Sequence, residues 1–363
     1  MITPIVQFGT SRFLQAHADL FVSEALERGE AIGRITVVQT TGSAERAGRL
    51  TALAAPEGFP VITRGLVKGA EIDRAQQVTS VARALSTADD WDEVKRIVAT
   101  EAEVLISNTG DTGYAVGPDD LVTEFPASFP GKLLILLHGR YRAGGKPLTI
   151  LPCELVARNG DTLKKVMLDL QAERIADQDF GEWLSTRVIW GNTLVDRIVS
   201  EPLQPAGAVA EPYALWAIEA QPGLKPPCTH PSILLVDDLS PYEKLKLHIL
   251  NLGHTVLADL WLKAGRQHDE TVKAILKDRD ILAKLMDIYE TEVLPGFAAR
   301  NLGSEAASYV ALTLDRFGNP FLDHRIRDIA NHHAEKITRR LADFRAWSPD
   351  VAMPKLTAII DNR

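Results

Sequence analysis

The chain of 363 residues is long enough for two domains, since one domain usually takes about 100–200 residues. Its net charge of −8 argues against a nucleic-acid-binding protein, which would usually carry a basic excess. The two cysteines, Cys153 and Cys228, exclude a disulfide scaffold and a cysteine-based zinc site, and they fit a reducing compartment.

Neither a signal peptide nor a membrane segment is predicted. Residues 1–9 hold a short apolar strand rather than a basic region followed by a long apolar stretch. The apolar runs are far shorter than the ~18–20 residues that a spanning helix needs. We therefore expect a cytoplasmic protein that has no membrane or nucleic-acid partner.

The first half of the chain alternates short apolar strands with helical patterns. An amphipathic helix is predicted from Phe13 to about Glu27, and strands are predicted at 5–8, 35–38, 104–106, 148–151 and 188–190. Strands spaced by helices of this length predict right-handed βαβ units and a mainly parallel sheet. Such sheets bind ligands at the carboxyl ends of their strands.

The second half changes character. Residues 201–231 are rich in Pro and Gly, so we expect an irregular segment there. After an apolar strand at 232–236, helical patterns dominate over 242–263, 269–294, 305–317 and 323–344. We predict an α/β domain over residues 1–237 and a mostly α-helical substrate and catalytic domain over residues 238–363.

The start of the chain has the order strand, glycine, helix. Gly9 allows a tight turn, and the amides of the following helix could then hold a pyrophosphate. Ser11 and Leu14 stand where the dinucleotide fingerprint has its second and third glycines, so a purely structural turn fits about equally well. On the first interpretation, residues 1–237 form a Rossmann-like NAD(P)-binding domain.

The second strand leaves the choice of cofactor open. An acidic residue at its end would bond the ribose of NAD, but Gln39 and Thr40 stand there, and Arg46 and Arg49 could accept a 2′-phosphate. The polar loop after the strand at 104–106 also lies at the carboxyl ends of the strands, where the cofactor is expected. The candidate cofactor-binding residues are Gly9, Thr10, Ser11, Arg12, Phe13, Gln39, Thr40, Ser107, Asn108 and Thr109.

The predicted helix over 242–257 carries polar residues on its apolar face. At ~100° per residue, Lys246, Glu243 and His254 fall inside an apolar arc of roughly 220°, and Asn251 lies at its edge. A snorkelling Lys246 paired with Glu243 is the structural alternative. Burying a polar group without a partner costs ~1–3 kcal/mol, so several on one face favour a polar pocket. There a buried lysine could act as a base and an asparagine amide could bond the reacting oxygen.

A lysine, an asparagine five residues later and a histidine three further resemble the signature of the mannitol dehydrogenase family, the polyol-specific long-chain dehydrogenases. The resemblance implies Lys246 as the general base, Asn251 and His254 as groups that orient and polarise the oxygen, and Glu243 as a gate for proton exchange. It also implies that Asn159 is a second contact of the oxyanion. Further stretches resemble the tagaturonate reductase (altronate oxidoreductase) branch, namely 106–109, 151–155, 159–160, 192–199, 210–216 and 316–321.

Candidate substrate-binding residues are fewer and each has a structural alternative. Asp196 is kept as a residue that supports the substrate contacts, although an ion pair with Arg197 fits about equally well. Asn319, His324 and Arg325 lie at and after a turn, where Arg325 could hold a carboxylate in bidentate geometry or simply lie on a helix surface. No convincing set of three metal ligands is found.

We therefore expect a metal-independent NAD(P)-dependent oxidoreductase that interconverts a secondary alcohol and a ketone on a small sugar acid or polyol. The resemblance favours NAD over NADP and excludes neither. A polyol-phosphate dehydrogenase, of the mannitol-1-phosphate type, is the first alternative. A non-catalytic NAD-binding sensor is the second. The oligomeric state is left open.

Overall fold

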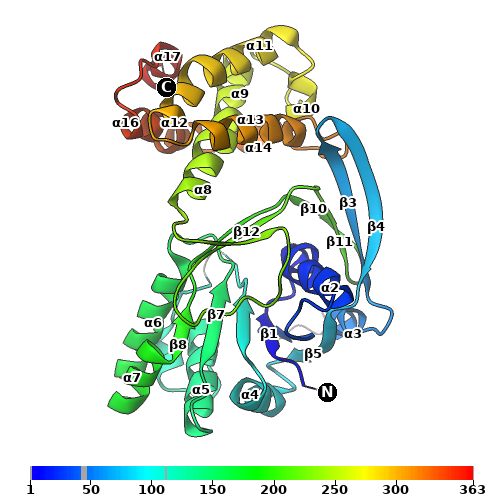
Figure 1. Cartoon of the computed structure of the whole chain (residues 1–363), viewed down its shortest axis with the longest axis vertical. Helices are drawn as coiled ribbons and strands as arrows, with labels where there is room; N and C mark the ends of the chain where they lie inside the picture. Colours follow the sequence, from blue (N-terminus) through cyan, green and yellow to red (C-terminus); the bar gives the residue numbers. More distant parts are fainter. Residues whose placement is uncertain (1, 42–46, 111–112, 363) are drawn as a thin grey trace. The chain divides into compact units, whose positions relative to one another are not determined.

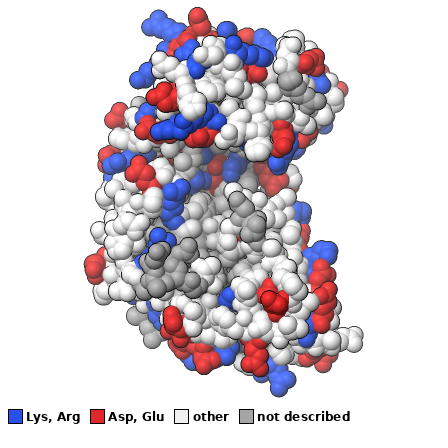
Figure 2. All heavy atoms as spheres, turned by 180° about the vertical axis from the view of Figure 1, so that it is seen from behind, with Lys and Arg blue, Asp and Glu red and all other residues white. Residues whose placement is uncertain are grey.

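The computed structural model describes residues 2–41, 47–110 and 113–362. The chain divides into two compact units (Figure 1). The first unit comprises Met1–Ile62 and Arg74–Leu239, and the second comprises Thr63–Asp73 and Ser240–Arg363. Among the described helices, none combines the length and the apolar composition needed to cross a membrane. Figure 2 shows acidic and basic side chains interspersed over the visible face.

A six-stranded parallel sheet forms the centre of the first unit. Its order is β5-β2-β1-β6-β7-β8, and every neighbouring pair is parallel. This arrangement confirms the predicted parallel sheet. The strands are β1 (Ile5–Phe8), β2 (Ile35–Gln39), β5 (Val81–Ser86), β6 (Val104–Ser107), β7 (Leu148–Pro152) and β8 (Val188–Trp190).

Both faces of this sheet are buried, as is typical of parallel sheets. Along β1, Ile5 packs into one apolar cluster and Val6 and Phe8 into the other, because successive side chains point to opposite faces. The helices are α1 (Arg12–Leu14), η1 (Gln15–Asp19), α2 (Leu20–Glu27), α3 (Ala47–Leu53), α4 (Trp91–Thr100), η3 (Pro118–Leu121), α5 (Phe129–Arg142), α6 (Asn159–Arg174) and α7 (Gln178–Thr186). Helix α2 packs into the cluster that contains Ile5, and helices α4 to α7 pack into the cluster that contains Val6 and Phe8.

The remaining described strands form two smaller sheets. One has the order β10-β11-β3-β4 and the other β13-β12-β9. The expectation of an irregular segment over 201–231 is therefore wrong, because parts of that segment pair as strands between its prolines. The strands are β3 (Phe59–Val67), β4 (Ala70–Val78), β9 (Thr193–Asp196), β10 (Val199–Pro202), β11 (Ala208–Ala210), β12 (Leu215–Glu219) and β13 (Ile233–Val236).

The second unit is helical except for the tip of the β3–β4 hairpin. The backbone N–H groups of Lys68 and Gly69 donate to the carboxylate of Asp315 at 2.6 and 3.1 Å, and these bonds tie the tip to α13. The helices are α8 (Ser240–Leu245), η4 (Lys246–Asn251), α9 (Leu252–Lys263), α10 (Val272–Ile275), α11 (Arg279–Ile288), η5 (Tyr289–Val293), α12 (Leu294–Ala298), α13 (Gly303–Phe317), α14 (Ile326–Ala330), α15 (His333–Ile337), η6 (Thr338–Ala342), α16 (Asp343–Trp347) and α17 (Pro354–Asp361).

Candidate functional site

The turn after β1 requires a glycine. Gly9 has φ +121°, and a Cβ at this position would lie 2.6 Å from the carbonyl oxygen of Asn108. The N–H of Gly9 donates to the carbonyl of Val38 at 3.0 Å, and the N–H of Asn108 donates to that of Phe8 at 3.0 Å. The turn thus lies against the end of β6, at the carboxyl edge where the strand order reverses and parallel sheets bind nucleotides.

Ser11 begins the helical segment that follows this turn. Its Oγ accepts a bond from the N–H of Leu14 at 3.3 Å and donates to Oδ1 of Asn108 at 3.1 Å. From Arg12 the segment runs continuously through η1 and α2, and the first N–H groups of a helix are available to an anion. The structure therefore brings together two of the predicted cofactor segments, residues 9–13 and 107–109.

The end of β2 carries no carboxylate. Gln39 is buried and its Nε2 donates to the carbonyl of Thr41 at 2.6 Å, while its Oε1 has no hydrogen-bond partner among the described residues. The carbonyl of Thr40 accepts a bond from Oγ1 of Thr87 at 3.3 Å. A small cavity of about 160 Å³ is lined by Arg12 and Arg49 among others, and Arg46 lies outside the described residues.

Glu154 is a buried residue that was not among the predicted site residues. Its carboxylate accepts bonds from Oγ of Ser107, from N and Oγ1 of Thr109, each at 3.0 Å, and from the hydroxyl of Tyr114 at 3.3 Å. Burial and the charge of Glu154 raise the pKa of Tyr114. Glu154 therefore holds the loop after β6 in place. Its position just after β7, at the same sheet edge, was the available signal.

Asn159 and Asp196 are both buried in the first unit. The Nδ2 of Asn159 donates to the carbonyls of Pro152 at 3.0 Å, Glu154 at 3.2 Å and Thr193 at 3.0 Å, and its Oδ1 accepts from two backbone N–H groups. Its described bonds thus go mainly to the backbone, and its predicted contact with an oxyanion stays a prediction. Asp196 lies at the end of β9, opposite Leu215.

The residue after Asp196 is also held in the fold. The guanidinium of Arg197 donates to the backbone carbonyl of Glu211, at 3.1 Å from Nε and 2.9 Å from Nη2, and to the carbonyl of Ala16. Burial lowers the pKa of Arg197 to about 10. These bonds join the start of α2's helical segment to the sheet that contains β9.

In the second unit, Lys246 and Asn251 occupy the two ends of a π-helical turn. The N–H of Leu252 bonds the carbonyl of Leu247, five residues earlier, as in a π-helix. An ordinary α-helix would place Lys246 and Asn251 about 140° apart, and the wider turn brings them closer to one side of the helix. The assumption of a continuous α-helix over 242–257 is therefore wrong.

Burial along this helix also differs from the prediction. His254 is buried, Lys246 and Asn251 are half-buried, and Glu243 is exposed. Glu243 lies in the short helix α8 before the π turn, so an angle counted through the turn misplaces it. One continuous helical segment carries Lys246, Asn251 and His254, the three residues of the family signature.

The ring of His254 lies among basic groups. It contacts the ring of Phe317 at 4.4 Å and meets that of His324 edge-on at 4.9 Å between centroids. Burial, and then the positive charges of His324, Arg316, Arg340 and Lys336, hold the pKa of His254 well below its usual range. The ring is therefore neutral at pH 7 and has one N–H to donate.

Arg340 bonds directly to the helix that carries Lys246. Its Nη1 donates to the carbonyl of Asn251 at 3.2 Å and to Oγ1 of Thr255 at 3.1 Å. Burial lowers its pKa and those of Lys336 and His324. Arg316, Lys336 and Arg340 were missed because they come from different helical segments, and each alone is indistinguishable from an ordinary surface base.

The other predicted substrate residues, Asn319 and Arg325, show no described contact with His254 or with the helix that carries Lys246. Asn319 is buried, but its Nδ2 donates to the carbonyl of Arg64 in β3 at 3.3 Å and its Oδ1 accepts from the N–H of Phe321 at 2.9 Å, so its described bonds are structural. Arg325 is exposed at the start of α14. Within the described ranges, no group of three or more His, Cys, Asp or Glu side chains could hold a metal ion.

Comparison with known proteins gives matches over most of the chain. The family model of the mannitol dehydrogenase Rossmann domain matches residues 3–227, and that of the mannitol dehydrogenase C-terminal domain matches residues 238–347. Altronate oxidoreductase of Halalkalibacterium halodurans is 28% identical over 360 residues, which cover 93% of this chain and 69% of that protein. Altronate oxidoreductase of Bacillus subtilis is 27% identical over 370 residues, covering 95% and 75%.

Two solved structures have the same fold. D-sorbitol dehydrogenase in substrate-free form superimposes with a TM-score of 0.79 at 21% identity, covering 95% of this chain and 75% of that one. The ternary complex of Pseudomonas fluorescens mannitol 2-dehydrogenase with NAD and D-mannitol gives a TM-score of 0.72 at 19% identity, covering 99% and 78%. The predicted Rossmann-like domain followed by a helical domain is thereby confirmed.

Proposed function

Because the chain belongs to the mannitol dehydrogenase family and is therefore an oxidoreductase that acts on CH–OH groups, we propose that it interconverts a secondary alcohol and a ketone on a sugar acid. In this proposal NAD is the cofactor and Lys246 is the general base. The observation that carries it is the π turn that brings Lys246 and Asn251 toward one side of the helix, one turn before a neutral His254.

The first unit fits a dinucleotide. Gly9 lets the chain turn tightly against the carbonyl oxygen of Asn108, and the helical segment from Arg12 supplies N–H groups for a pyrophosphate. The Oε1 of the buried Gln39 at the end of β2, which has no hydrogen-bond partner among the described residues, can accept from a ribose hydroxyl. When bound, the nicotinamide accepts a hydride from the alcohol or returns one to the ketone. Glu154 would hold the Ser107–Thr109 loop for that contact.

The second unit supplies the proton chemistry. In the oxidative direction the neutral amine of Lys246 takes the hydroxyl proton while the carbon loses its hydride, and in the reductive direction the ammonium returns that proton. The amide of Asn251 and the N–H of His254 would donate to the oxygen as negative charge develops on it. The exposed carboxylate of Glu243, one turn before Lys246, would then exchange the proton with water.

The basic residues near His254 support an acidic substrate. Arg316, Lys336 and Arg340 each act on His254 as positive charges, and Arg340 is bonded to the backbone of Asn251. A carboxylate on the substrate would be stabilised by this positive potential, and a neutral polyol would gain nothing from it. The two relatives compared above are named altronate oxidoreductases, and altronate is a sugar acid.

The same basic residues favour one second candidate, a dehydrogenase of a phosphorylated polyol, because a phosphate would also be stabilised there. A substrate panel separates the two. Hexuronates, aldonates, ketoses and polyol phosphates would each be assayed with both NAD(H) and NADP(H), following the absorbance of the reduced cofactor. Our proposal predicts turnover with a hexuronate or aldonate at least ten times that with any polyol phosphate. The reverse ranking would replace it with the second candidate, and no turnover with any substrate would point to a non-catalytic sensor.

A further inference from the structure

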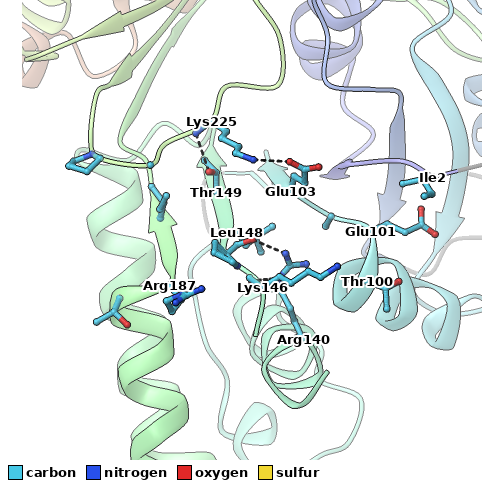
Figure 3. A pocket seen from close by; sticks show the side chains of 16 residues that line it. Ile2, Thr100, Glu101, Glu103, Arg140, Lys146, Leu148, Thr149, Arg187 and Lys225 are labelled. Carbon is cyan, nitrogen blue, oxygen red and sulfur yellow. Dashed lines mark hydrogen bonds and ion pairs between the residues drawn. The ribbon is translucent and has the colours of Figure 1, made fainter. Parts of the chain in front are cut away.

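A cavity of about 710 Å³ lies at the amino-terminal edge of the parallel sheet (Figure 3). Among the residues that line it are Glu103, just before β6, Leu148, the first residue of β7, and Arg187, just before β8. Gly9 and Asn108 follow their strands at the opposite, carboxyl edge. A strand of four residues such as β6 rises ~13 Å, so a ligand in this cavity would not touch the candidate cofactor loop.

A buried cation forms part of the cavity wall. Arg140 is 2% exposed, and its guanidinium donates to the carbonyls of Lys146 at 2.8 Å, Val98 at 2.6 Å and Pro147 at 2.8 Å. All three acceptors are neutral, and no carboxylate of the described chain forms an ion pair with it. Burial accordingly lowers the pKa of Arg140 to about 10. A guanidinium has five N–H groups, so two remain for a further acceptor.

Two more cations line the cavity. Lys146 and Arg187 are exposed, and within the described part of the chain neither side chain forms an ion pair or a hydrogen bond. In Figure 3 the side chain of Arg187 extends toward the cavity from the β8 side. Arg140, Lys146 and Arg187 therefore contribute three positive charges that no described carboxylate pairs with directly.

The two described carboxylates in the lining, Glu101 and Glu103, offset these charges only in part. Glu103 pairs with Lys225 at 3.0 Å, and the two are joined in Figure 3. Glu101 pairs with Arg83 at 2.5 Å and with Arg96 at 2.8 Å. Each carboxylate is thus already matched by at least one cation, and the surplus in the cavity is positive.

We propose that this cavity binds a small organic anion that carries phosphate or carboxylate groups. Its volume lies within the range of about 300–1,000 Å³ found for small-molecule sites. Arg187 and Lys146 would bind the anionic groups, with Arg140 behind them, because charge-assisted bonds from Arg and Lys are the usual means of holding such groups. Leu148, Ile189 and Pro222 give the carbon skeleton an apolar wall. The inference is independent of the proposed function.

Isothermal titration calorimetry tests this directly. Inorganic phosphate and succinate would be titrated separately into the full-length protein with saturating NAD present, so that the candidate pyrophosphate site is occupied. Sodium chloride of equal ionic strength is the blank. Comparing the two anions distinguishes a phosphate site from a carboxylate site. The variants are Lys146→Ala/Arg187→Ala and Glu103→Gln, with Lys165→Ala, an exposed lysine of α6 paired with Asp169, as the matched control.

We expect saturable binding of at least one anion, weakened about tenfold or more in the double variant, since two charge-assisted bonds are lost. Lys165→Ala should bind as the wild type does. Glu103→Gln should bind several-fold more tightly, because it releases Lys225 and removes a competing negative charge, and this gain cannot arise from misfolding. Heats equal to the sodium chloride blank for both anions would overturn the proposal. So would unchanged affinity in a double variant whose circular dichroism spectrum is native.

Discussion

Gly9→Ala is the substitution for which the structure allows the closest estimate. An alanine at φ +121° pays about 1–2 kcal/mol for a backbone conformation that L-residues avoid. Its Cβ would start 2.6 Å from the carbonyl oxygen of Asn108, and relieving that contact in a packed turn costs about 1–2 kcal/mol more. We expect Gly9→Ala to lower the free energy of unfolding by about 2–4 kcal/mol in total. For a domain of 150–250 residues this lowers Tm by about 4–16 °C.

The same displacement should affect the cofactor. Relieving the contact would move the carbonyl of Asn108, which disturbs the loop that would contact the nicotinamide, and would shift Leu14 at the start of the helix that would hold the pyrophosphate. We expect the Kd for NADH, measured by fluorescence titration, to rise at least about tenfold, equivalent to about 1.4 kcal/mol.

Gly29→Ala is the matched control for this measurement. Gly29 has φ +70°, and no atom lies within 4 Å of the point that a Cβ would occupy, so the substitution carries the backbone cost without the steric one. It should lower Tm by a few degrees and leave the Kd for NADH unchanged. A Gly9→Ala protein that binds NADH like the wild type would refute our placement of the cofactor at this turn.

Three further outcomes are expected. Incubation with EDTA should leave turnover intact, because Lys246 supplies the proton acceptor without a metal; activity lost on chelation and restored by Zn²⁺ or Mn²⁺ would contradict this. NADH should give a higher kcat/KM than NADPH, although Arg49 could pair with a 2′-phosphate, and a clear preference for NADPH would reverse the assignment. Burial raises the pKa of Asp19 to about 8, whereas an unfolded chain has about 3.9, so the folded state retains a proton that the unfolded chain loses as the pH rises between these values. The free energy of unfolding should therefore fall from about pH 4 to 8. Between pH 5 and 7.5, Asp19→Asn should lose about 1–3 kcal/mol less of it than either the wild type or the exposed control Asp92→Asn. Equal losses in all three proteins would disprove this assignment.

Five of the six central strands could be predicted because they are short, apolar and largely buried. The edge strand β5 was not predicted, because it contains Arg83 and most of its residues are only half-buried. The β3–β4 hairpin could not be predicted either. Its outer strand, Ala70–Val78, is mostly exposed and polar, so its sequence lacks the alternation that marks a strand over a core. The strands within residues 201–231 were hidden by prolines, which lie at or next to strand ends as well as in loops.

At the candidate site, spacing along the chain was more informative than the helical wheel. The interval of five residues between Lys246 and Asn251 matches one π turn, which a periodicity of 3.6 cannot represent. Polar residue type was a poorer guide, since the described bonds of Asn159 and Asn319 go mainly to the backbone of the fold. The partners of Glu154 and Arg340 are distant in sequence, so only the position of Glu154 at a strand end could have indicated its role.

The most direct test of the account is the turnover of Lys246→Ala with its best substrate. Lys244→Ala is the matched control, because Lys244 lies on the same helix, with its Nζ 5.5 Å from the centre of the Trp347 ring. If Lys246 is the general base, its loss should lower kcat by ~10²–10⁴-fold and remove the pH-dependent limb of alcohol oxidation. The Kd for NADH and the Tm should change little, and Lys244→Ala should retain most of the wild-type turnover. A Lys246→Ala protein that keeps more than about a tenth of wild-type turnover would contradict the account.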